Sequence, residues 1–134
     1  MKAVAMVSSE VNISVVIVDD NADVRQALRL LCEQSLGMGV RGEIDSLAGL
    51  VAHLETLERG IILFDWGLAR DVNEAKFLFL RLHKVARSFI VVLGSRPETR
   101  ADAVAAGADA FVYKGDPPEH LLNLLQAFKY TRRP

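Results

Sequence analysis

The sequence predicts an α/β domain in which helices cover both faces of a five-stranded parallel sheet. Short, continuously apolar runs alternate with longer segments of helical spacing along almost the whole chain. Each run is apolar throughout, as expected of strands that are buried on both faces. Because crossovers between parallel strands are right-handed, five strands alternating with five helices form most simply a doubly wound sheet. The length of 134 residues suits one such domain.

The five strands are predicted from β-branched and aromatic runs that end abruptly at polar residues. The second run carries Arg41 and Glu43, which favours an edge position in the sheet. The predicted strands lie at residues 13–18, 40–44, 61–64, 89–93 and 110–113.

The helices between them are predicted from apolar residues with helical spacing. The first uses Val24, Ala27, Leu28, Leu31 and Cys32, with Arg25, Arg29 and Glu33 facing solvent. The second is capped by Ser46 and uses Leu47, Leu50, Val51 and Leu54. The third uses Phe77, Leu78, Leu80, Leu82 and Val85, and the alanine-rich fourth ends at Gly107. The last starts with Asp116 as its cap, Pro117 in its first turn and Glu119 completing a capping box.

Composition excludes several classes of protein. The net charge is −1 with both signs spread along the chain, so we expect no direct binding to nucleic acid or to a membrane surface. No segment has the roughly 18 apolar residues that a membrane span requires, and residues 1–12 lack the apolar run of a secretion signal. A cytoplasmic protein is therefore expected. The single cysteine, Cys32, excludes an intrachain disulfide and is expected to be a buried structural thiol.

Acidic residues gather where predicted strands end. Asp19 and Asp20 follow the first strand, and Asp65 follows the third. In the strand order 2-1-3-4-5 these two strands are neighbours, so the three carboxylates converge beyond the sheet's carboxyl edge. Carboxylates this close repel one another unless a cation offsets them, and Mg²⁺ suits an all-oxygen site that leaves positions for phosphate oxygens. Lys114, at the end of the fifth strand, adds an ammonium, and a carboxylate such as Asp65 can act as a nucleophile in phosphoryl transfer.

The acid pair, the single acid and the lysine resemble the site of response-regulator receiver domains, the CheY-like phosphoproteins of two-component signal transduction. The resemblance covers residues 13–130, between a leader at 1–12 and a tail at 131–134. It implies a flavodoxin-like (βα)5 sandwich. It also implies that Asp19, Asp20, Asp65 and Gly67 hold Mg²⁺, and that Asp65 is the phosphoacceptor. Lys114 would contact the phosphoryl group, and Phe111 stands at the family's aromatic switch position.

The sequence departs from the family's pattern at three places. The family usually ends strand four in a Ser or Thr whose hydroxyl contacts the phosphoryl group, but here that residue is Gly94. Ser95 is a candidate substitute one residue later, although a shift of one residue points a strand side chain to the other face. The proline that usually follows the lysine is Gly115, and the proline expected after the acceptor is Ala69.

The leading hypothesis is therefore a stand-alone receiver that is not an enzyme beyond its own phosphotransfer and dephosphorylation. Its expected partners are a sensor histidine kinase or phosphotransfer protein, a downstream effector protein, and a second copy bound through the fourth helix, fifth strand and fifth helix. Three alternatives stay open. These are a degenerate receiver that binds proteins without phosphorylation because of Gly94, a receiver fragment of a longer DNA-binding regulator, and a small hydrolase using the same acids.

Overall fold

The computed structural model describes residues 13–131, and these form a single parallel sheet with the strand order β2-β1-β3-β4-β5. The predicted fold class and strand order are confirmed. The strands are β1 (Ser14–Val18), β2 (Gly39–Ile44), β3 (Gly60–Asp65), β4 (Phe89–Gly94) and β5 (Ala110–Tyr113). The predicted leader and residues 132–134 of the tail lie outside the described residues.

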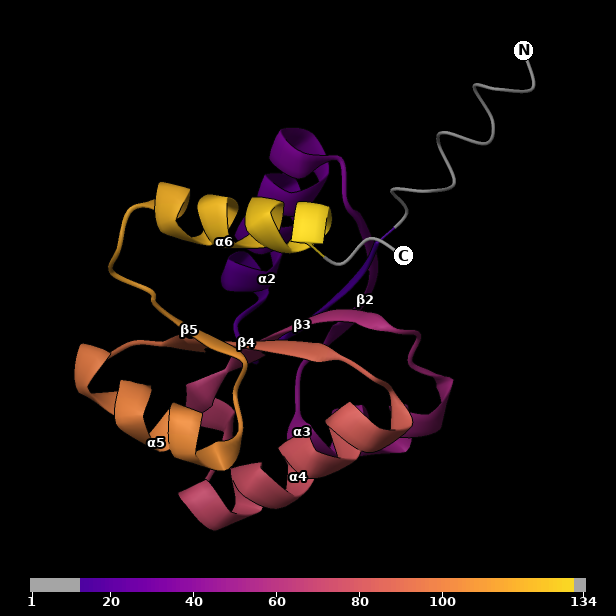
Figure 1. Cartoon of the computed structure of the whole chain (residues 1–134), viewed down its shortest axis with the longest axis vertical. Coiled ribbons are helices and arrows are strands. Elements are labelled where there is room, and N and C mark those ends of the chain that lie inside the picture. The colour runs from indigo at the N-terminus through magenta and orange to yellow at the C-terminus, as the bar shows by residue number, and fades with distance from the viewer. Residues whose placement is uncertain (1–12, 132–134) are drawn as a thin grey trace.

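Helices cover both faces of the sheet, so the molecule has three layers (Figure 1). On one face lie α2 (Ala22–Leu30) and α6 (Pro118–Thr131), and on the other lie α3 (Leu47–Ala52), α4 (Val72–Val85) and α5 (Arg100–Ala106). Short 3-10 turns occur at Leu54–Thr56, Trp66–Leu68 and Pro97–Thr99. None of the helices in residues 13–131 is long and apolar enough to span a membrane.

The sheet separates two apolar cores because successive strand residues point to opposite faces. Val16, Val18, Ile62 and Phe64 pack toward α3, α4 and α5, and Val15, Ile17, Ile61 and Leu63 pack toward α2 and α6. All eight are at most 6% exposed, which explains why the strand runs are apolar without alternation. In β2, which pairs only with β1, exposed residues alternate with half-buried ones, so the predicted edge position is confirmed.

Side-chain caps start the helices that follow β1, β2 and β3. Asn21 accepts hydrogen bonds from the backbone N–H groups of Asp23 and Val24, and Ser46 accepts one from Gly49. Asp71 caps α4 in the same way. Gly107 ends α5 with φ 105°, the left-handed conformation that glycine adopts at least cost. These caps fix where each chain segment leaves the sheet, and therefore where the strand-end residues lie.

Helix α4 corrects one prediction about the core. Its buried residues are Ala75, Leu78, Phe79 and Leu82, which fall on one face at the 3.6-residue period. Phe77, Leu80 and Val85, predicted to be in the core, are 67%, 53% and 48% exposed. The prediction was wrong there because it chose residues by apolar character and not by the angle at which each leaves the helix axis.

The start of one other helix differs from prediction. Helix α2 continues through a π-helical turn at Leu31–Ser35 and ends before Gly37, which has a φ of 64°. Helix α6 begins at Pro118, and the carboxylate of Asp116, the predicted cap, lies 3.0 Å from Nδ1 of His120. Cys32 is fully buried, as predicted, and burial raises the pKa of its thiol to about 11.

Candidate functional site

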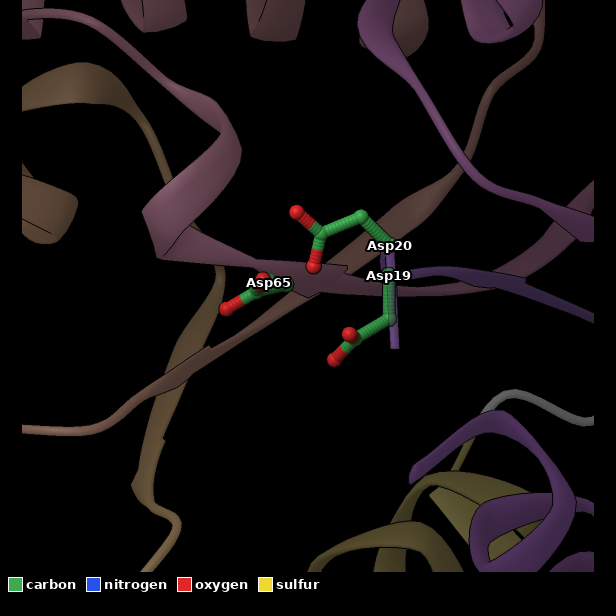
Figure 2. A group of neighbouring side chains, drawn as sticks. All are labelled: Asp19, Asp20 and Asp65. Atoms are coloured by element: carbon green, nitrogen blue, oxygen red, sulfur yellow. The ribbon is translucent and has the colours of Figure 1, made fainter. Parts of the chain in front are cut away.

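Three carboxylates meet at the carboxyl ends of β1 and β3, as predicted. Residues Val18 and Phe64 are partners in the β1–β3 register, so the residues that follow them emerge side by side. One ligand oxygen from each of Asp19, Asp20 and Asp65 lies within 4.8 Å of the others. Figure 2 shows their side chains gathered in one small region. The convergence expected from strand order alone is confirmed.

Asp19 is the buried member of this group, and all its polar atoms are hydrogen-bonded. It is 1% exposed, and its Oδ1 accepts a hydrogen bond of 2.9 Å from the backbone N–H of Asn21. Its Oδ2 accepts a hydrogen bond of 3.0 Å from Lys114, and its backbone N–H donates to the carbonyl of Ile44. A buried carboxylate is tolerated when its oxygens are paired in this way. Asp20, by contrast, is exposed to solvent.

Lys114 joins the ends of β1, β3 and β5. Its Nζ lies 3.0 Å from Oδ2 of Asp19 and 3.1 Å from Oδ1 of Asp65. The same Asp65 oxygen accepts a 3.2 Å hydrogen bond from the backbone N–H of Gly67. The other oxygen of Asp65, Oδ2, accepts no hydrogen bond from residues 13–131. One oxygen of Asp65 is thus held by two hydrogen bonds, and the other accepts none from the described residues. The side chain is 13% exposed.

The charges of the site favour a protonated Lys114. Burial alone would lower the pKa of this ammonium, but hydrogen bonds and charge from Asp19 and Asp65 outweigh burial and raise it. The cluster has three carboxylates but only one ammonium, so two negative charges stay uncompensated. The arrangement therefore attracts a further cation.

The donor set fits Mg²⁺. This ion prefers oxygen ligands and is usually held by one or two carboxylates together with several waters. Asp19, Asp20 and Asp65 offer carboxylate oxygens within 4.8 Å of one another, and Asp20 is exposed to solvent. Soft ligands that would select another metal are absent from this cluster.

Comparison with known proteins agrees with this geometry. The family model of the response regulator receiver domain matches residues 15–126. The chain belongs to the response regulator receiver domain family. A comparison with curated protein sequences finds no match.

Solved receiver structures share the fold at low identity. The isolated receiver domain of RcsB from Salmonella enterica serovar Typhimurium, with phosphomimetic BeF3−, has a TM-score of 0.75 at 22% identity, covering 92% of each chain. The response regulatory domain of MrkE from Klebsiella pneumoniae has a TM-score of 0.74 at 22% identity, covering 88% of this chain and 96% of that one. A CheY-like receiver from Methanospirillum hungatei JF-1 has a TM-score of 0.72 at 22% identity, covering 89% and 94%. At these identities the likeness shows the fold alone.

Some similar structures are longer than this chain. RcsB bound to the promoter rprA has a TM-score of 0.73 at 21% identity, and the match covers 86% of this chain and 67% of RcsB. The expected lack of nucleic-acid binding therefore stays a prediction, as does the expectation that this receiver stands alone.

At the end of β4 the ring of Phe111 fills the space that a side chain at position 94 would occupy. A Cβ added to Gly94 would lie 2.7 Å from Cε1 and Cζ of the Phe111 ring and 2.8 Å from Oγ1 of Thr99. Phe111 is 7% exposed, belongs to the core between the sheet and α5, and lies 5.2 Å below the Arg100 guanidinium. Gly94 and the buried ring of Phe111 are therefore complementary in shape.

Two further predicted site residues lie at the surface. Gly67 is exposed next to Asp65, and a Cβ there would be 3.5 Å from both carboxylate oxygens, so its backbone borders the Asp65 side chain. Ser95 is exposed, and its hydroxyl makes no hydrogen bond within residues 13–131. The roles predicted for both residues stay predictions.

Sequence reasoning missed two residues that support the site. Arg25 was expected to face solvent, but its side chain is 18% exposed and donates a 2.7 Å hydrogen bond to the carbonyl of Asp19. Thr99 is buried against Gly94 and donates to the carbonyl of Arg96. Neither residue carries a signal in the sequence, because its partner is set by how a helix packs on the sheet.

Proposed function

We propose that this receiver accepts a phosphoryl group on Asp65 from the phosphohistidine of a sensor histidine kinase or phosphotransfer protein. The observation that supports this most strongly is the pairing of Asp65 Oδ1 with Lys114 and the Gly67 N–H, which leaves Oδ2 without a hydrogen bond from residues 13–131. Oδ2 forms the new O–P bond as the N–P bond of phosphohistidine breaks, and its electron pair stays on the imidazole.

The other site residues prepare this transfer. Asp19, Asp20, Asp65 and the Gly67 carbonyl would hold Mg²⁺, which supplies positive charge to the transferring oxygens. The ammonium of Lys114 would contact the phosphoryl oxygens, and its raised pKa keeps it charged at neutral pH. The carboxylate and carbonyl oxygens of Asp19 all accept hydrogen bonds, so Asp19 would hold the metal-binding carboxylates and Lys114 in position.

Labelling with acetyl phosphate tests the acceptor directly. With Mg²⁺, mass spectrometry of the intact chain should show one added phosphoryl group, and chelation of the metal should remove it. Asp65→Asn should abolish the label, whereas Asp102→Asn, which removes an exposed acid of α5, should leave it. Labelling of Asp65→Asn at the wild-type level would overturn the proposal.

The degenerate receiver remains a second candidate, and the packing of Phe111 against Gly94 favours it. Where the family has a residue with a hydroxyl, this chain has Gly94, and the ring of Phe111 fills the space beside it. In this alternative Asp65 is labelled but affinity for a partner or a second copy does not change. In the leading proposal, phosphorylation changes one of those affinities. Steady turnover of a phosphate ester would instead support the hydrolase.

A further inference from the structure

The outer surface of α3 and α4 carries an apolar patch that the phosphoacceptor site does not use. Phe77 and Leu80 of α4 are 67% and 53% exposed, and Val51 of α3 is 51% exposed. Beside them a hollow of about 480 Å³ lies between the two helices. The residues that line it are Leu47, Ala48, Val51, Ala52, Leu54, Glu74, Phe77, Leu78 and Arg81. Large apolar side chains exposed together mark an interaction surface more often than singly scattered ones.

This α3–α4 face has both a projection and a recess. The Phe77 ring is two-thirds exposed, whereas Ala48 and Ala52 lie one helical turn apart on α3 and leave room above them. A surface that contains both shapes side by side can pair with itself about a two-fold axis, because each copy then places its ring in the recess of the other.

The charges beside Phe77 have the same self-complementary pattern. Glu74 precedes Phe77 by three residues and Arg81 follows it by four, so all three share one face of α4 and line one hollow. In an antiparallel crossing of two α4 helices centred near Phe77, Glu74 of each copy lies opposite Arg81 of the other. Glu74 already pairs with Arg70 at 3.0 Å, whereas Arg81 has no ion pair within residues 13–131.

We propose that a second copy of this chain docks on the α3–α4 face, with Phe77 at the centre of the interface. An unrelated acidic peptide would satisfy Arg81 but would place like charge next to Glu74. A second copy in antiparallel orientation places Glu74, which already pairs with Arg70, opposite the Arg81 that has no ion pair within residues 13–131. This dimer is distinct from the one predicted through α5, β5 and α6, and it does not depend on phosphorylation of Asp65.

Sedimentation of the full chain, with chelator and without a phosphoryl donor, tests the proposal. The average mass should rise from monomer towards dimer between roughly 10 and 500 µM. Phe77→Arg should weaken this association at least about tenfold, since aromatic anchors dominate small interfaces. Val104→Arg is the matched control: Val104 is 56% exposed and lies one turn after Arg100 on α5, on the side of the alternative dimer. It should leave the association unchanged.

Reversal of the two charges tests the orientation. Arg81→Glu should weaken association because it places two acids opposite each other at both ends of the interface. Adding Glu74→Arg to that variant should restore it. Thermal melting by circular dichroism checks that each variant folds, and the substituted side chains are exposed or half-buried. A monomer at all concentrations would overturn the proposal. So would an association that Phe77→Arg leaves intact, or one that the second charge reversal fails to restore.

Discussion

Substitution of Gly94 by alanine should destabilise this protein, although the same change at most strand positions would not. In an open site, Gly→Ala stabilises by about 0.4–1 kcal/mol because it restricts the unfolded chain. Here the new Cβ would lie 2.7 Å from two Phe111 ring carbons, about 1 Å inside the usual contact distance of about 3.5–4.0 Å. The sign of the change therefore reports whether Phe111 occupies this space.

Neither the backbone at Gly94 nor the ring of Phe111 can move away easily. The Gly94 carbonyl accepts a 2.7 Å hydrogen bond from the backbone N–H of Lys114, which holds the end of β4 against β5. The Phe111 ring is enclosed by the core and by Arg100, and turning it outward would expose an aromatic side chain. Overpacking of this kind costs about 1–3 kcal/mol. We expect a net loss of about 1–2 kcal/mol in the free energy of unfolding.

Urea unfolding measures this loss, with the single tryptophan, Trp66, as the fluorescent probe. Gly39→Ala is the control, because no atom lies within 4 Å of a Cβ at that exposed strand position. Phe111→Leu removes the crowding ring atoms, so it should cost at least about 1 kcal/mol less in the Gly94→Ala background than in the wild type. A Gly94→Ala variant as stable as Gly39→Ala, or a coupling energy near zero, would refute the packing argument.

Four further outcomes are expected. Asp65→Asn in metal-free buffer should be as stable as the wild type or slightly more stable, because it removes one of three crowded carboxylates while Lys114 keeps Asp19; a clear fall in melting temperature would contradict this. Lys114→Met should destabilise at neutral pH. Because the folded pKa of Lys114 is raised, its contribution is complete below the ordinary lysine value near 10.4 and is lost as pH rises through the raised value, so urea curves of the two proteins should converge there. Cys32 should react with iodoacetamide at pH 8 at least roughly 100-fold more slowly in the folded than in the unfolded chain, because its thiol is fully buried and burial raises its pKa to about 11. With Mg²⁺ and BeF3−, amide NMR signals of Lys114 and Gly94 should shift together if the switch operates; shifts confined to the surroundings of Asp65 would favour the degenerate receiver.

The sheet and the acidic site could be predicted because both depend on simple periodicity. Strands buried on two faces are apolar at every residue, as in 61–64, and parallel strands bring their carboxyl ends to one edge. Once the strand order is assumed, Asp19, Asp20 and Asp65 can only meet there. No side-chain detail was needed.

The remaining features depend on contacts between segments that are distant in sequence. The glycine at position 94 is visible in the sequence, but the ring that fills its space is 17 residues away on another strand. Phe77 was predicted to be buried because it is apolar, yet the core face of α4 belongs to its neighbours Leu78 and Phe79. In both cases the sequence gives the type of residue but not the direction in which its side chain points.

One backbone hydrogen bond, from Lys114 to Gly94, connects the acidic site to the end of β4. A phosphoryl group on Asp65 would compete with Asp19 for the ammonium of Lys114, and so would pull on the end of β5. Lys114 donates its backbone N–H to Gly94, and Phe111 lies three residues earlier on the same strand. A displacement of Lys114 would therefore reach the end of β4 through this hydrogen bond, without a hydroxyl at position 94. A receiver with glycine here can switch through the backbone, provided that the charge on the phosphoryl group moves the lysine more strongly than Asp19 holds it.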